Sequence, residues 1–417
     1  MEKIVSIDNH RPGHNNSMGR SFPFGLARVM IFAIAVALQF DFYSIGPVSI
    51  VTLLVISYLL FLSPLVFSNT RRLKSFRKFV APVIIFVVLL TIVNIFNVNE
   101  VSNDFLPIGI LLGVLLFIFS LTQLSYDPKA LQYILYGIMT GGIIMSMCFL
   151  FNIGVDYEEE RGRLMMFGLN SNNLGCLTCL SVAIVIQTFL LDTRNYNIIL
   201  KGIFLLSIIP MTQLIFATAS RTAFVSFVLL FLTIILLHIP RLKGFQRFLI
   251  ILVLAAGVYL GFQLFMDSEL LFTRMALSLE QEDSGGRDVI WGRLFALAMN
   301  NPLGIGETGY TEYAFRTLHT TYIEGAASPH NVFLESYIYA GFIGFVCITY
   351  FWLRLVIVSF RTYKKTKQLL LILFMEIFTV QMMLGQLLNF RIAWLSFAVV
   401  VFMGYRELSK RTQLAKQ

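Results

Sequence analysis

Charged side chains are scarce in this sequence. Only 13% of the 417 residues are Asp, Glu, Lys or Arg, whereas 57% are hydrophobic. This composition excludes a soluble globular protein, in which about a quarter of the residues are charged. The period-2 alternation of a transmembrane β-barrel is also missing from the sequence, and apolar runs long enough to cross about 30 Å of hydrocarbon recur instead. The predicted fold class is an all-α, polytopic membrane bundle of about 12 transmembrane helices, with one large outward loop that contains short helices.

Cysteine is equally scarce, and the four cysteines all lie inside apolar segments: Cys148, Cys176, Cys179 and Cys347. This placement gives no disulfide framework. Cys176 and Cys179 form a CxxC, but no second pair and no histidine lies nearby in the sequence, so we interpret them as packing residues. Asp and Glu form no cluster with metal-ligand spacing. We therefore expect neither a metal nor a cofactor.

Twelve apolar segments are predicted to span the membrane. They are Val29–Tyr43, Val48–Phe67, Val80–Val98, Phe105–Leu124, Leu131–Phe151, Asn173–Leu191, Ile198–Thr218, Thr222–His238, Phe248–Met266, Asn331–Phe360, Gln368–Leu388 and Ile392–Tyr405. No cleavable signal peptide is visible before them. The sequence divides into an N-terminal tail (1–28), helices one to nine (29–266), a large loop (267–329), helices ten to twelve (330–405) and a C-terminal tail (406–417).

The connections that carry Lys and Arg alternate along the chain with those that do not. Basic stretches such as "RRLKSFRK", "PRLKGFQR" and "RTYKKTK" fall on one side, together with both tails, if the count is twelve. The positive-inside rule then places both termini in the cytoplasm. Loop 267–329 lies on the opposite side and holds nine acidic residues against four arginines, a net charge of −5. Because the whole chain has a net charge of +9, the residues outside this loop carry +14. The basic balance is therefore a topology signal, and no nucleic-acid partner is expected.

Polar residues gather at the outer ends of the predicted helices. In chain order they are Arg161 and Arg163, Arg221, Arg287 with Arg293, and His330 with Asn331. Taken singly, an arginine at a helix end is typical of a snorkelling anchor and a histidine there of a polar cap. Together, forked guanidinium donors and one titratable imidazole at one depth suit a lipid-linked pyrophosphate. A helix N-terminus should also lower the pKa of the His330 imidazole and favour its neutral form.

Two further stretches of the large loop have a local interpretation. "GRDVIWGRLFALAM" repeats apolar residues at helical spacing, which predicts an amphipathic helix with Arg287 in its first turn. "NPLGIGETGY" contains GxG but follows no strand, so a dinucleotide site is excluded. We interpret it as a glycine-rich loop that needs unusual backbone angles or a close backbone approach.

"SRTA" at a helix entrance, "GGRDVIW…NPLGIGETGY" in the long loop and "PHNVFLESYIYAGFIG" at the next helix resemble the O-antigen ligase/polymerase superfamily. That superfamily includes Wzy-type and exopolysaccharide polymerases and O-antigen ligases. The resemblance covers roughly Arg161 to Gly344. It implies that Arg221, Arg287 and His330 hold an undecaprenyl pyrophosphate and assist transfer. Arg163 and Asn170 are similar to a weaker family pattern before the sixth helix.

The resemblance implies a glycosyltransferase of the bacterial inner membrane. We expect it to polymerise undecaprenyl-pyrophosphate-linked repeat units at the periplasmic face, without a metal and with inversion, with a chain-length regulator as a possible partner. One alternative is an O-antigen ligase that moves the glycan onto lipid A–core. Another is a flippase for lipid-linked oligosaccharide, although the polar residues are concentrated in one outer loop rather than along a central path.

Three charged residues are interpreted from topology alone. Arg391, on the short turn after the eleventh helix, is a further candidate for substrate binding. Arg354 and Glu376 each lie eleven residues from Lys365 in the loop between the tenth and eleventh helices. In an antiparallel hairpin they should lie at equal depth, so we expect a structural ion pair between them. A proton relay through Glu376 is the functional alternative.

Overall fold

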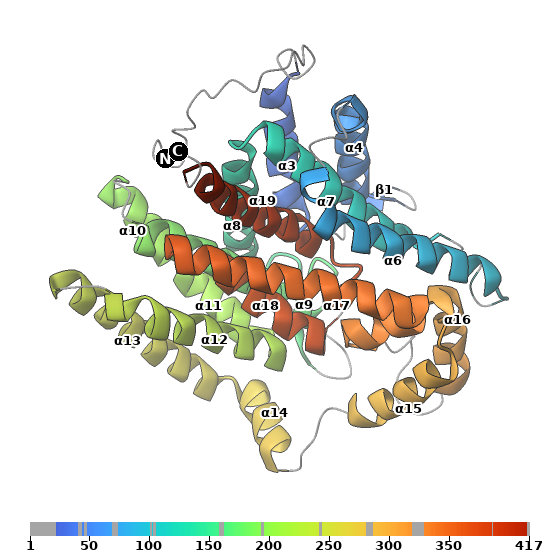
Figure 1. Ribbon diagram of the computed structural model, residues 1–417. Helices are drawn as coiled ribbons and strands as arrows, with labels where there is room; N and C mark the ends of the chain where they lie inside the picture. The colour runs from blue at the N-terminus through green and yellow to red at the C-terminus, as the bar shows by residue number, and fades with distance from the viewer. Residues whose placement is uncertain are drawn as a thin grey trace.

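The computed structural model is a bundle of helices with two short β-hairpins (Figure 1). It describes residues 22–40, 44–45, 48–68, 74–100, 102, 106–157, 162–192, 196–241, 244–280, 287–318, 329–385 and 387–414. The fold class is that of a polytopic helical membrane protein, as the composition predicts.

The N-terminal half contains the helices α3 (Phe24–Ala37), α4 (Ile50–Ser68), α6 (Arg77–Phe96), α7 (Ile108–Tyr126), α8 (Ala130–Leu150), α9 (Ser171–Val185), α10 (Ile198–Leu206) and α11 (Ile208–Ala217). The π-helix η1 (Ile186–Leu191) continues α9. Strands β1 (Ser44–Ile45) and β2 (Val48–Ser49) form one antiparallel hairpin, and β3 (Val155–Tyr157) and β4 (Leu164–Met166) form the other.

The C-terminal half contains α12 (Arg221–Leu237), α13 (Gly244–Asp267), α14 (Glu269–Glu280), α15 (Arg287–Asn300), α16 (Gly306–Tyr313), α17 (Val332–Thr366), α18 (Leu370–Leu384) and α19 (Arg391–Leu414). Short helical turns are η2 (Ile239–Arg241) after α12 and η3 (Ala314–Leu318) after α16. Figure 1 shows α14 at the bottom of the view, α15 at the lower right and α16 at the right.

Eight helical segments among the described residues are long and apolar enough to cross a membrane, and two shorter apolar helices accompany them. Each of the twelve segments expected from the sequence overlaps a helix, or the consecutive pair α10 and α11 in the case of Ile198–Thr218. The number of spans nevertheless stays a prediction, because α3 and α18 are shorter than a full span and α13 and α19 are not among the eight.

Helix α9 lies at the centre of the bundle, since 83% of its apolar window is buried, more than in any other candidate span of the described residues. Cys176 and Cys179 are both buried there, and Cys179 Sγ lies 3.6 Å from the carbonyl oxygen of Ala223 on α12. Their small side chains therefore pack α9 closely against α12.

The glycine-rich loop before α16 docks into a kink of α17. Gly341 breaks α17 with φ 68° and ψ −170°. Phe342 N donates to Pro302 O at 2.9 Å, and Ile305 N donates to Ile338 O at 2.8 Å. A Cβ on Gly304 would lie 2.5 Å from Gly341 N. The prediction that this loop needs unusual backbone angles and a close approach is confirmed, because Gly304 also has φ 82°.

The expected ion pair between Arg354 and Glu376 is not formed. Glu376 Oε1 accepts a hydrogen bond from Thr233 Oγ1 of α12, and the Arg354 guanidinium carbon lies 5.5 Å from the centre of the Phe79 ring of α6. Neither Glu376 Oε2 nor Arg354 Nε has a hydrogen-bond partner in the part of the chain that the structure describes. Equal distance from the connecting loop fixes depth but not rotation about the helix axis, and the two helices turn these groups toward different neighbours.

Candidate functional site

A tight turn between α11 and α12 positions Arg221. Ala219 adopts φ 46°, and Ser220 caps α12 by accepting a hydrogen bond from Ala223 N at 3.2 Å. Arg221 follows as the first residue of α12 and is half-buried. The cap explains why the helix begins here, since a serine hydroxyl satisfies one of the N–H groups that the first turn leaves open.

Amide side chains tie the start of α9 to its neighbours. Asn170 caps α9 by accepting from Asn173 N at 2.9 Å. Ser220 Oγ donates to Asn172 Oδ1 at 2.7 Å, and Gln381 Nε2 of α18 donates to Asn173 Oδ1 at 2.9 Å. The starts of α9 and α12 and the end of α18 therefore meet at one end of the bundle, which we call the loop end.

Helix α17 forms a hairpin with α18 through the short connection 367–369, so it begins on the side of the bundle where α18 ends. Asn331 caps α17 by accepting from Phe333 N and Leu334 N, each at 3.1 Å. His330, immediately before this cap, adopts φ 50°. The amide oxygen of Asn331 is thus engaged by its own helix.

A tryptophan holds α15 against the start of α17. Trp291 Nε1 donates to Pro329 O at 2.8 Å, directly before His330. Arg287 is the first residue of α15 and lies four residues before Trp291, so the two positions share one face of the helix. The structure therefore brings the helix position of Arg287 close to that of His330. The amphipathic helix expected at Arg287 is confirmed as a helix, α15.

Arg274 of α14 supports the same region and was not identified from the sequence. Its Nη1 donates to Ala219 O at 2.5 Å, which fixes α14 over the turn that carries Arg221. A charge-assisted hydrogen bond of this kind is stronger than a neutral one. Arg274 lies inside α14, and no sequence pattern pairs it with the α11–α12 turn.

The loop end combines positive charges with helix N-termini. Helix α12 begins there, and α15 contacts the segment that leads into α17 through Trp291. The N-terminus of each helix carries about half a positive charge. Arg221 stands at the first position of α12, whose first turn contains no acidic residue. A cation at this position destabilises a helix by about 0.3–1 kcal/mol. A bound anion would offset that cost, so the arrangement suits an anionic ligand.

The remaining candidates are spread more widely. Arg163 is buried at the start of β4, in the β3–β4 hairpin that leads into α9. Arg293 is exposed on α15. Arg391 begins α19 and donates from Nη1 to Thr52 Oγ1 of α4 at 2.9 Å. This bond holds Arg391 against α4. Arg161 lies outside the described residues.

A buried acidic group beside α16 was also missed. Glu335, five residues after His330, is 3% exposed, and its Oε2 has no hydrogen-bond partner among the described residues. Burial raises the pKa of the neighbouring Tyr310 hydroxyl above its ordinary value, and the negative charge of Glu335 raises it further. Asn94 of α6 accepts a hydrogen bond from Glu307 N at 2.7 Å and so fixes the start of α16 in this cluster. A lone Glu near the start of an apolar segment was the available signal.

A protein-family model matches the part of the chain that contains this region. Residues 203–349 match the family model described as O-antigen ligase (Wzy_C), and this match identifies the O-antigen ligase/polymerase family. The matched segment runs from α10 into α17 and contains Arg221, Arg287 and His330. No curated protein sequence matches the chain. The match suggests a polysaccharide-transferring membrane enzyme and implies a lipid-linked glycan as its substrate.

Proposed function

We propose that this member of the O-antigen ligase/polymerase family is a polymerase. It joins undecaprenyl-pyrophosphate-linked repeat units at the periplasmic face of the bacterial inner membrane, with both termini in the cytoplasm. Two contacts support this most: Ser220, beside Arg221, is bonded to Asn172 at the start of α9, and Trp291, one turn from Arg287, is bonded to Pro329 beside His330.

The charge pattern agrees with an anionic donor. Loop 267–329 has a net charge of −5. A pyrophosphate near this loop therefore needs specific cations, because the overall field of the loop repels it. Arg221 and Arg287 supply guanidinium groups at helix N-termini, where backbone N–H groups also point toward an anion.

The proposed reaction is a single displacement. A hydroxyl oxygen of the acceptor sugar forms a bond to the anomeric carbon of the donor, and the bond from that carbon to the pyrophosphate oxygen breaks. The pyrophosphate leaves on its lipid, and Arg221 and Arg287 stabilise the charge that builds on it. His330 orients the acceptor hydroxyl or takes its proton. Attack on the face opposite the leaving group inverts the anomeric centre.

Purified protein and a defined undecaprenyl-pyrophosphate-linked repeat unit test this proposal. The wild type should convert the donor to a ladder of longer lipid-linked chains. Arg287→Ala should lower turnover by about 100-fold or more, as expected when one stabilising group is removed from a transition state. Arg316→Ala is the matched control, because Arg316 is an exposed arginine of the same loop paired with Glu312. Normal turnover of Arg287→Ala at normal protein level would exclude Arg287 from the mechanism.

The same assay separates the polymerase from a ligase. A polymerase extends the lipid-linked unit when that unit is the only glycan present. A ligase leaves it unchanged until lipid A–core or another terminal acceptor is added. Transfer that depends on the added acceptor would replace our proposal with the ligase activity, whereas movement of the donor across vesicles without any glycan extension would indicate a flippase.

A further inference from the structure

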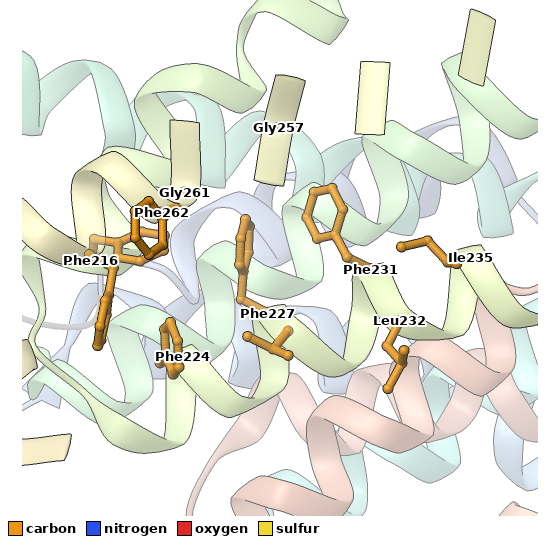
Figure 2. Close-up of a pocket in the computed structure, with 11 residues that line it drawn as sticks. Phe216, Phe224, Phe227, Phe231, Leu232, Ile235, Gly257, Gly261 and Phe262 are labelled. Atoms are coloured by element: carbon orange, nitrogen blue, oxygen red, sulfur yellow. The ribbon is translucent and has the colours of Figure 1, made fainter. Parts of the chain in front are cut away.

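An apolar cavity of about 410 Å³ lies between α12 and α13 (Figure 2). Six phenylalanines from three helices line it: Phe216, Phe224, Phe227, Phe231, Phe262 and Phe265. Figure 2 shows the rings of Phe227 and Phe231 pointing from α12 toward Gly257 and Gly261 on α13. The aromatic lining can make many dispersion contacts with a hydrocarbon chain.

Two glycines of α13 keep the cavity open. A Cβ on Gly257 would lie 3.5 Å from the ring of Phe231, and a Cβ on Gly261 would lie 3.6 Å from that of Phe216. These are ordinary contact distances, so any longer side chain at either position would project into the cavity. The cavity also opens toward the outside of the bundle, since Phe262 is 58% and Leu232 is 44% exposed.

One end of the cavity reaches the candidate site. Phe224 lies one helical turn after Arg221, and its ring stacks on that of Phe265 at 5.1 Å between centroids. Arg274 is bonded to Ala219 in the turn just above. The other end reaches Ile235, eleven residues farther along α12, a length of about 16 Å. The lining itself is wholly apolar, and Arg221 and Arg274 lie just beyond its Phe224 end.

We propose that this cavity binds the polyprenyl chain of the donor, specifically the isoprene units next to the pyrophosphate. This inference rests on the proposed function and adds to it the place where the lipid is held. An isoprenoid with an anionic head fits because the channel is apolar and its Phe224 end lies one helical turn from Arg221 at the candidate site. The channel covers about half of a hydrocarbon layer about 30 Å thick, so the distal isoprene units remain in the bilayer.

Holding the first isoprene units would place the pyrophosphate beside Arg221. The methyl branches of an isoprenoid fill the spaces between aromatic rings better than a straight chain does, because dispersion energy depends on close contact over the whole surface. A straight phospholipid acyl chain is the competing occupant. If the cavity prefers the isoprenoid, an excess of phospholipid does not displace it. If the cavity takes any acyl chain, the excess does displace it.

Photocrosslinking of protein in nanodiscs distinguishes them. The probe is a polyprenyl pyrophosphate with a diazirine on its first isoprene unit. It should label α12 or α13 along the cavity, and undecaprenyl phosphate should compete while excess phosphatidylglycerol should not. Gly261→Leu, and Gly257→Leu at the next level of the cavity, should each lower labelling at least tenfold. Gly202→Leu is the matched control, because nothing lies within 4 Å of a Cβ there.

Each outcome decides a separate point. Labelling that phosphatidylglycerol removes equally well, or labelling that persists in both cavity variants, would overturn the proposed lipid site. Cavity labelling in a protein that transfers no sugar from a polyprenyl donor would leave the lipid site in place and refute the proposed function instead. Among variants that still transfer sugar, the donor KM should rise about tenfold in Gly261→Leu with little change in kcat, since filling the cavity removes ground-state binding.

Discussion

Replacing Gly341 with alanine should destabilise the protein by about 3–5 kcal/mol. Gly341 has φ 68° and ψ −170°, a backbone region that is essentially restricted to glycine. An alanine held there costs about 1–3 kcal/mol in strain. Its Cβ would also lie 2.5 Å from Pro302 O and from the carbonyl carbon of Leu303, so the docked loop would have to move.

Moving that loop breaks the two hydrogen bonds that join it to the kink, Phe342 N to Pro302 O and Ile305 N to Ile338 O. Each is worth about 1 kcal/mol, which adds about 2 kcal/mol to the strain. The contacting atoms are backbone atoms of the opposing segment, so they cannot rotate away as the end of a side chain could.

Reversible unfolding of the purified protein in mixed micelles with increasing SDS measures the difference. Gly202→Ala is the control, since Gly202 lies inside α10 with open space around it and should tolerate alanine or gain up to about 1 kcal/mol. If Gly341→Ala unfolded within about 0.5 kcal/mol of the wild type, typical of an unconstrained surface position, the docking of the loop into the kink would be refuted.

Trp291→Phe keeps the ring but removes the hydrogen bond to Pro329 O, so it should lower turnover about fivefold to tenfold by loosening α15 beside His330, a loss of about 1 kcal/mol. Turnover equal to that of the wild type would mean that α15 is positioned without this bond. Thr233→Val removes the donor to Glu376 and should lower the free energy of unfolding by about 1–2 kcal/mol. Thr91→Val, which loses only a bond within its own helix, is its control, and equal effects of the two would contradict a special role for the Thr233–Glu376 contact.

The helices of the bundle could be predicted from local pattern, because each apolar segment has to satisfy its own backbone hydrogen bonds in hydrocarbon. The α15 helix followed from the spacing of its apolar residues. The β3–β4 hairpin did not, since Val155–Tyr157 and Leu164–Met166 are short and lie in a stretch that otherwise has the composition of a loop. Helix α16 was missed because its glycines argue against a helix, although Asn94 fixes its first turn from a distant part of the chain.

The candidate site was predicted in part. The order of helices and the distribution of charge predict Arg221, Arg287 and His330 at one end of the bundle. The Trp291–Pro329 contact ties α15 to the segment before His330, and the meeting of all three residues stays a prediction. Arg274 and Glu335 could not be recognised, because the residues near them in the structure belong to segments that are distant in the sequence. Their roles depend on contacts with Ala219 and with the α16 cluster.

The sequence by itself determined that the chain folds as a membrane bundle and that its polar groups gather at helix ends, because hydrocarbon penalises every unpaired backbone group and every charge. Only the tertiary structure decided how each helix is rotated and how closely it approaches its neighbours. That rotation directs Glu376 to Thr233 instead of Arg354, and the spacing of α12 and α13 leaves the phenylalanine-lined cavity open. Both depend on the simultaneous packing of side chains from distant segments, which no local pattern specifies.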